Sequence, residues 1–185
     1  MMKPSMSATS DRFRPLRFAA PLSVLLLSAC ASSPPPAEAP AALTQATPEQ
    51  MVAAIDAAAG SGEGELAVQP LRDPMVEDLR EQARDARAAA RHEDAASALD
   101  RALAIVPDDP ALLQERAEAA LLQRDFALAG RFAESAFALG AQVGPLCRRH
   151  WATIEQVRLV AGDAEGAASA KAQVAGCRVA GPDRF

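Results

Sequence analysis

The 185 residues are half apolar but only 4% aromatic, with no tyrosine, which indicates one domain whose interior is filled by Ala, Leu and Val in closely packed helices. Residues 1–29 hold four cationic side chains and one acidic side chain, a net charge of +3, so the remainder carries −8 within a total of −5. An acidic domain repels phosphate backbones and anionic lipid headgroups, which argues against nucleic acid and against a basic contact with a bilayer.

An export signal is predicted at the start of the chain. A basic stretch that ends at Arg17 precedes an apolar run, residues 18–27, of the length typical of a signal peptide and too short to span a membrane. Leu27-Ser28-Ala29-Cys30 follows directly and resembles the lipobox of bacterial lipoproteins. The resemblance implies cleavage after residue 29 and lipid on Cys30, and it places the protein at the outer membrane, facing the periplasm of a Gram-negative bacterium. The alternative is an ordinary signal beside a coincidental cysteine.

The segment after the lipobox is predicted to be a tether. Residues 31–46 are rich in proline, alanine and serine and have no apolar period, so we assign residues 30–46 to the lipidated cysteine and a semi-rigid linker. In the polyproline conformation, at ~3.1 Å per residue, this linker reaches roughly 50 Å. The domain can therefore search a volume below the membrane.

A short helix is predicted within the next segment, residues 47–73. Residues 47–50 form a capping box with proline at the first helical position, and Gly60 ends the helix. The apolar residues of this helix fall on one face: Met51, Val52 and Ile55. Residues 65–71 are extended in character and form either a loop or a strand-like peptide against the domain.

Regularly spaced signals for helix starts and helix ends begin at residue 73. Helices are expected to start at Asp73-Pro74, Asp109-Pro110 and Gly144-Pro145, with breaks near His92, Arg124 and Gly162. Residues 95–107 align with residues 129–141 at a period of 34, the length of a tetratricopeptide repeat, which this stretch resembles. The resemblance implies an all-α solenoid of about three helix hairpins over residues 74–185, preceded by the extra helix. The three repeats would cover residues 76–109, 110–143 and 148–181.

The register of the repeat makes further predictions. The third repeat needs a shift of four residues, which we place in a loop at residues 144–147, where insertions are tolerated. Small residues are expected where the two helices of each hairpin cross: Ala95, Ala129 and Ala167. The helix at 48–59 could cover an exposed end of the stack. The alternative is an alanine-rich bundle with accidental periodicity.

The cysteines predict one disulfide. Once the lipidated Cys30 is set aside, Cys147 and Cys177 remain, in a compartment that oxidises thiols. In the repeat register these two cysteines begin and end the third hairpin, and an antiparallel hairpin brings such positions together. The alternative is a pair of buried free thiols.

The sequence gives no sign of catalysis. His92 and His150 stand alone, without a metal-binding or nucleophile–base pattern, and the glycine-rich residues 60–64 lack the lysine and the strand–helix context of a phosphate loop. We therefore expect a protein that is not an enzyme, with no cofactor and no metal.

Tetratricopeptide stacks hold peptides on a concave face lined by the first helix of each repeat. Carrying those positions over to this chain gives a candidate groove: Glu77, Arg80, Arg84, Arg87, Gln114, Glu118, Leu121, Leu122, Arg149, Gln156, Leu159 and Val160. The arginines at 80, 84 and 87 share one helix face and could clamp a carboxylate or an acidic peptide. The alternative is a solvated face paired internally. The apolar residues at 121, 122, 159 and 160 form a strip that residues 65–71 could equally cover.

Anchor, tether and repeat stack together favour an outer-membrane-anchored periplasmic module for protein–protein interaction, an adaptor or scaffold in envelope assembly or secretion. Its partner is an envelope protein or peptide that the sequence does not name. One alternative is a structural or glycan-associated envelope lipoprotein, for which an exposed aromatic platform is expected; Trp151, the only tryptophan, suits the core better. Another is an accessory periplasmic chaperone that binds unfolded chains through the apolar strip.

Overall fold

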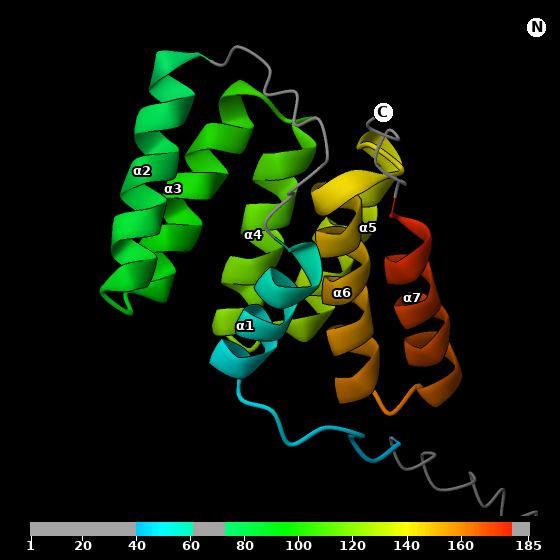
Figure 1. The fold of residues 1–185 in the computed structure, drawn as a ribbon. Coiled ribbons are helices and arrows are strands. Elements are labelled where there is room, and N and C mark those ends of the chain that lie inside the picture. Colours follow the sequence, from blue (N-terminus) through cyan, green and yellow to red (C-terminus); the bar gives the residue numbers. More distant parts are fainter. Residues whose placement is uncertain (1–39, 61–72, 179–185) are drawn as a thin grey trace, which may run out of the picture. The chain divides into compact units, whose positions relative to one another are not determined.

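A computed structural model describes residues 40–60 and 73–178, and every regular element in these two ranges is a helix (Figure 1). The seven helices described are α1 (Pro48–Ala59), α2 (Pro74–Ala88), α3 (His92–Ile105), α4 (Pro110–Leu122), α5 (Phe126–Leu139), α6 (Gly144–Val160) and α7 (Ala164–Gly176). The predicted all-α, solenoid-like architecture is therefore confirmed. The export signal, Cys30, most of the tether and residues 65–71 lie outside the described ranges.

Six of the helices form three hairpins, in which α2 packs on α3, α4 on α5 and α6 on α7 (Figure 1). Each hairpin turns through one residue in the left-handed backbone region: Ala90, Arg124 and Gly162, with φ of 55°, 63° and 75°. These positions are 34 and 38 residues apart, which is the predicted period and then the predicted shift of four. Gly162 is also needed for space, because a Cβ there would lie 2.6 Å from Pro40 and from the carbonyl oxygen of Ala41.

The helix starts follow from capping side chains. The Asp73 carboxylate accepts a hydrogen bond from the amide of Met75, and Asp109 does the same for residues 111 and 112. Thr47 and Gln50 form the predicted capping box at α1. Helix starts were thus predictable, because Asp or Thr followed by proline presets the first turn and satisfies its free amides.

The four-residue insertion of the third repeat is helical, so its predicted place in a loop is wrong. Residues 144–147 form the first turn of α6, which has 17 residues, whereas α4 has 13. Pro145 at the start of α6 fixes a helical φ and removes an amide that has no partner there. The insertion therefore lengthens a helix by about one turn, and the helix can be extended without disturbing the crossing below it.

Small residues let the helices approach within each hairpin. Ala95, Ala129 and Ala167 are 3%, 0% and 4% exposed, which confirms them as buried crossing positions. Trp151 packs against Phe137 with ring centroids 4.6 Å apart and joins the core formed by α4 to α7. The only tryptophan therefore contributes to packing.

Helix α1 lies on α6 and α4 and does not cover an end of the stack, which corrects that expectation. Val52 and Ile55 join one cluster with Leu121 of α4 and Ala152 of α6. The amphipathic pattern correctly identified which face of α1 is buried. It could not say against which helices, because any apolar surface satisfies such a face.

The third hairpin carries a disulfide, and the segment before α1 also attaches there. Cys147 in the first turn of α6 is bonded to Cys177 at the end of α7, with Cα atoms 5.8 Å apart. The amide of Leu43 donates to the carbonyl oxygen of Leu159, at 2.8 Å. The described part of the tether therefore meets the domain beside the α6–α7 turn.

Candidate functional site

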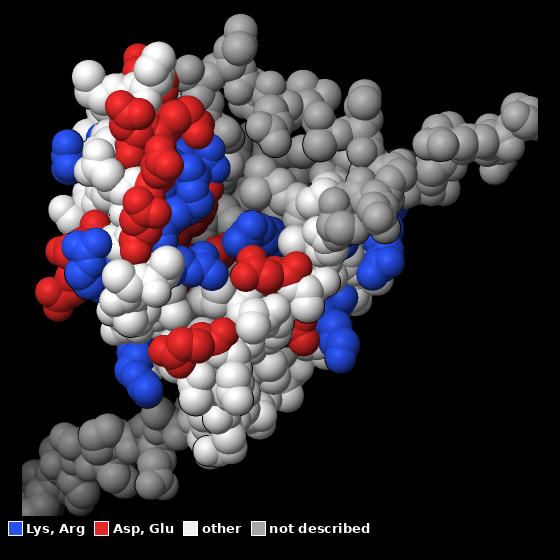
Figure 2. All heavy atoms as spheres, turned by 60° about the vertical axis from the view of Figure 1, so that its left-hand side comes forward, with Lys and Arg blue, Asp and Glu red and all other residues white. Residues whose placement is uncertain are grey.

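The predicted arginine row lies on α2, and two of its three members are paired with the protein's own carboxylates. Arg80 forms a salt bridge with Glu115 of α4 and a second with Glu77, at 2.9 Å. The hydrogen bonds that Arg80 donates to Glu115 raise the pKa of this arginine. Acidic and basic side chains lie next to one another over the side of the molecule that holds α2 (Figure 2). The alternative of an internally paired face is thus correct for Arg80.

Arg87 and Arg149 converge on one carboxylate, Glu118, which is 0% exposed. The guanidinium nitrogens lie 3.0 Å (Arg87) and 2.7 Å (Arg149) from its oxygens. Asp56 of α1 pairs with the same two arginines, at 3.6 Å and 2.7 Å. Burial disfavours the charge of Arg149, but the carboxylates of Glu118, Asp56 and Glu115 together outweigh burial and raise the pKa of this arginine. Four helices are therefore joined by one network of alternating charges.

Hydrogen bonds between uncharged side chains extend this network into the core. The amide nitrogen of Gln114 donates to Glu118 and to the hydroxyl oxygen of Thr153, at 2.9 and 2.8 Å. Its carbonyl oxygen lies 2.7 Å from Nδ1 of His150, so Nδ1 carries the proton and Nε2 is the bare nitrogen. Nε2 is buried without a hydrogen-bond partner. Burial, and then the charge of Arg149, lower the pKa of His150 to about 4.

The remaining arginine of the row, Arg84, is exposed and makes no hydrogen bond or ion pair with any described residue. It stands at the rim of a cavity of about 150 Å³ between α2, α3 and α4. Alanines together with Leu99 and Leu122 make up the apolar part of its wall, and Arg87 and Arg149 lie at the same cavity. A free positive charge thus stands beside a small apolar hole.

The predicted apolar strip is mostly used by the protein itself. Leu121 is 0% exposed and packs against Val52 and Ile55, so α1 covers it. Leu122 is 9% exposed and borders the cavity. Leu159 is half-buried beside the segment before α1. The groove expected along all three hairpins is therefore filled by α1 over the second and third, and over the first none of the described residues covers it.

Sequence reasoning missed some members of this site. Asp56 and Glu115 hold the arginines, but they were absent from the carried-over positions. Asp56 directly follows Ile55, so the apolar face of α1 shows that its carboxylate lies at the edge of the contact with the stack. Glu115 is next to the carried-over Gln114, and no sequence signal distinguishes its pairing with a residue 35 positions away.

The described residues include no group of three or more His, Cys, Asp or Glu side chains arranged to hold a metal ion. Across residues 40–60 and 73–178, none of the helices combines the length and the apolar character needed to cross a bilayer.

No protein-family model and no curated protein matches the chain. Among solved structures, it is similar to the globular C-terminal domain of LpoP from P. aeruginosa, with 28% sequence identity and a TM-score of 0.54. The similarity spans 57% of this chain and 99% of that domain. The similarity thus extends over nearly the whole of that domain, and this chain has further residues outside it.

Proposed function

We propose that this protein is a non-catalytic interaction module of the bacterial envelope, held to the outer membrane by lipid on Cys30 and exposed to the periplasm. The lipobox and the tether support the anchor. The solved neighbour is likewise described as a globular C-terminal domain, which fits a plan in which a folded domain follows an N-terminal segment. A partner protein binds the open part of the concave face, over the first hairpin.

The observation that carries this proposal is Arg84 beside the cavity between α2, α3 and α4. The other two arginines of the row already have carboxylate partners, whereas Arg84 has none among the described residues. A volume of about 150 Å³ is below the roughly 300–1,000 Å³ of sites for small molecules, and it suits a single apolar side chain. Such a hole resembles the central pocket into which a protein partner inserts one anchoring residue.

The chemistry of the surface defines the partner's contact. An apolar side chain fills the hole, and a neighbouring carboxylate pairs with Arg84. Arg87 and Arg149 also line the cavity, but Glu118 and Asp56 balance their charges, and Glu115 at the same wall pairs with Arg80. The charge left for a partner's carboxylate is therefore that of Arg84 alone. An arginine fork also binds a carboxylate with two parallel hydrogen bonds, which fixes the orientation of the partner.

Site-specific cross-linking tests the proposal. A photoreactive residue replaces Arg84 in the full chain in living cells, and the same residue replaces Arg131 of α5 in a control strain. Arg131 is likewise exposed, but it is not at the cavity. We expect irradiation to give one dominant cross-linked envelope protein from position 84 and none from position 131. The partner is identified by mass spectrometry.

A charge reversal gives the second half of the test. In the same assay, with the photoreactive residue at Leu122, Arg84→Glu is expected to lower the yield of the cross-linked species at least tenfold, because an acidic contact becomes repulsive. Arg131→Glu should leave the yield unchanged. Equal yields from both variants, or identical products from positions 84 and 131, would remove the assignment of the first hairpin as the binding surface.

A further inference from the structure

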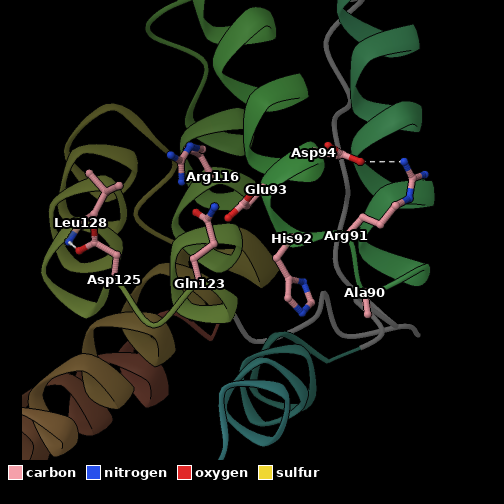
Figure 3. A pocket seen from close by; sticks show the side chains of 9 residues that line it. All are labelled: Ala90, Arg91, His92, Glu93, Asp94, Arg116, Gln123, Asp125 and Leu128. Carbon is pink, nitrogen blue, oxygen red and sulfur yellow. Dashed lines mark hydrogen bonds and ion pairs between the residues drawn. The ribbon is translucent and has the colours of Figure 1, made fainter.

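A second depression, of about 830 Å³, lies beside the turns of the first two hairpins (Figure 3). It is bordered by the first turn of α3, by Arg116 and Gln123 of α4, and by Asp125 and Leu128 at the start of α5. Arg84, Arg87 and Arg149 are not part of it. The depression is flanked by the two hairpin turns at residues 89–91 and 123–125, and His92 is the one residue that lines both it and the cavity beside Arg84.

Arg116 presents a fixed and unused hydrogen-bond donor to this cleft. The residue is 7% exposed, and its Nε donates to Asp100 at 2.7 Å while its guanidinium lies 5.2 Å from the ring centroid of Phe132. These contacts hold the plane of the guanidinium in place. Its remaining nitrogen, Nη1, is buried and has no hydrogen-bond partner. A buried donor without an acceptor is unfavourable, so an acceptor supplied by a ligand is stabilised here.

A second buried atom without a partner borders the same cleft. Nδ1 of His92 lacks a hydrogen bond, so two of the three such atoms among the described residues belong to side chains that line this depression. The third belongs to His150, which lies in the core. Because His92 also lines the cavity beside Arg84, the unsatisfied atom that belongs to this depression alone is Nη1 of Arg116. Native interiors leave few polar atoms unsatisfied, so this donor indicates a place that a polar ligand completes.

The charges of the cleft identify the other half of the ligand. Arg91 pairs with Asp94 at 2.8 Å, and Arg116 pairs with Asp100. Glu93 forms no ion pair with any described residue, and Asp125 accepts only the capping hydrogen bond from the amide of Leu128. Two carboxylates therefore remain uncompensated beside the fixed donor. The net charge of −8 on residues 30–185 strengthens the attraction for a cation.

We propose that this cleft is a second binding site, for an extended polypeptide segment that carries a lysine or arginine. One backbone carbonyl oxygen of the segment accepts a hydrogen bond from Nη1 of Arg116, and the cationic side chain pairs with Glu93 and Asp125. A free anion would meet two carboxylates, and a simple cation would leave the guanidinium donor unsatisfied. A basic peptide supplies both groups. The site rests on the proposed function only in that its occupant is a segment of a protein partner.

A titration with defined peptides tests the site. The probes are acetyl-GGKGG-amide and acetyl-GGEGG-amide, added to the ¹⁵N-labelled mature chain with its lipid anchor in detergent micelles. We expect the lysine peptide, and not the glutamate peptide, to shift the amide resonances of Glu93 and Asp125 and the side-chain Nε resonance of Arg116. Shifts of equal size with both peptides, or no shift at these positions, would overturn the proposal.

Conservative variants then assign the contacts. Glu93→Gln with Asp125→Asn removes both charges but keeps the α5 cap, because asparagine caps as well as aspartate, and it should weaken the lysine peptide about tenfold. Glu134→Gln, at an exposed carboxylate elsewhere on α5, should leave the affinity unchanged. Arg116→Lys keeps the charge but loses the guanidinium donor, and a fivefold weakening of the lysine peptide is expected at a temperature where circular dichroism shows the variant to be folded. Unchanged affinity in the double variant would remove the site.

The two proposals fail separately. The photo-cross-link from position 84 is measured in the Glu93→Gln, Asp125→Asn double variant. If the lysine peptide loses affinity while the dominant cross-linked protein is still obtained, the cleft is a second site beside an intact concave surface. If the lysine peptide binds the cleft but no protein is cross-linked from position 84, the proposed binding surface at Arg84 is wrong and the proposed peptide site in the cleft is retained.

Discussion

The first hairpin and the two that follow it come from the same repeat, yet they use equivalent positions differently. Over the second and third hairpins, α1 covers the concave face, so Glu118 and Leu121 are buried in contacts with the protein itself. Over the first hairpin, Arg84 and a small apolar hole remain accessible. A repeat position therefore becomes core or binding surface according to whether an added element lies on it, and stability and binding are divided between the two regions.

The largest effect is expected from Glu118→Ala, in the covered region. The substitution leaves Arg149 and Arg87 without their shared carboxylate and removes one acceptor from Gln114. Breaking a buried ion pair typically costs about 3–5 kcal/mol, and we expect a loss of about 4 kcal/mol because two arginines and Gln114 lose their acceptor at once. Urea unfolding followed by circular dichroism measures the change. Glu115→Ala, at a more exposed ion pair, should cost about 1 kcal/mol or less.

Removal of the disulfide should be the next largest effect. On the chain-entropy model, a bond between Cys147 and Cys177 closes about 30 residues and stabilises the fold by about 3–4 kcal/mol. The Cys147→Ser, Cys177→Ser variant is therefore expected to unfold at lower urea concentration. In this variant, hydrogen exchange should become faster in α6 and α7. Faster exchange in α2 and α3 alone would contradict the stabilisation of the third hairpin by the disulfide.

Truncation on α1 tests whether that helix belongs to the fold. Ile55 is 0% exposed, so Ile55→Ala leaves a cavity between α1, α4 and α6 and should cost about 2–4 kcal/mol. Leu43→Ala is the matched control, because Leu43 is 51% exposed and its truncation should cost less than about 0.5 kcal/mol. Equal thermal stabilities of the two variants would mean that α1 detaches readily and that the covered region is open as well.

Acid should weaken the covered region through His150. Its pKa is lowered to about 4, so the unfolded state binds this proton first, and the stability present above pH 6.5 is lost as the pH falls toward 4. At pH 5 the free energy of unfolding is expected to be about 2 kcal/mol lower than at neutral pH. Most carboxylates titrate below pH 5, so they contribute little to this change. Urea midpoints from pH 7.5 to pH 5 measure it. If the urea midpoint of a His150→Gln variant fell with pH as steeply as that of the unaltered protein, the pH dependence would belong to other groups.

The smallest effect on stability is expected from Arg84→Glu, in the open region. Arg84 has no partner among the described residues, so the free energy of unfolding should change by less than about 0.5 kcal/mol. A calorimetric melt compared with that of Arg131→Glu measures this change. A loss above 1 kcal/mol would show that Arg84 supports the fold, and it would remove the contrast between the two regions.

Much of the fold was predictable because its signals are local. Asp-Pro pairs set the starts of α2 and α4, and a recurring backbone turn sets the hairpins. The contact made by α1 was not predictable, because an amphipathic face specifies burial and leaves the partner helix open. The insertion at residues 144–147 was misplaced for a similar reason, since a helical turn and a loop of four residues give the same shift in register.

The candidate site was predictable only in part. Helical spacing correctly placed Arg80, Arg84 and Arg87 on α2, at one face of the stack. Their pairing depends on carboxylates 31 to 35 residues away in α4, and such distances in sequence carry no periodic signal. The cleft beside Arg116 was missed altogether, because nothing in the sequence distinguishes a buried guanidinium without an acceptor from an ordinary arginine on a helix.

The attachment of residues 40–47 has a mechanical consequence. Any pull along the chain from its N-terminal side enters the domain at the backbone contact between Leu43 and Leu159, next to α1 and the third hairpin. That hairpin is closed by a covalent bond between its two helices, so it resists separation under load. The first hairpin lies outside this path. A partner bound there would therefore meet an undistorted surface while the N-terminal side of the chain bears the force.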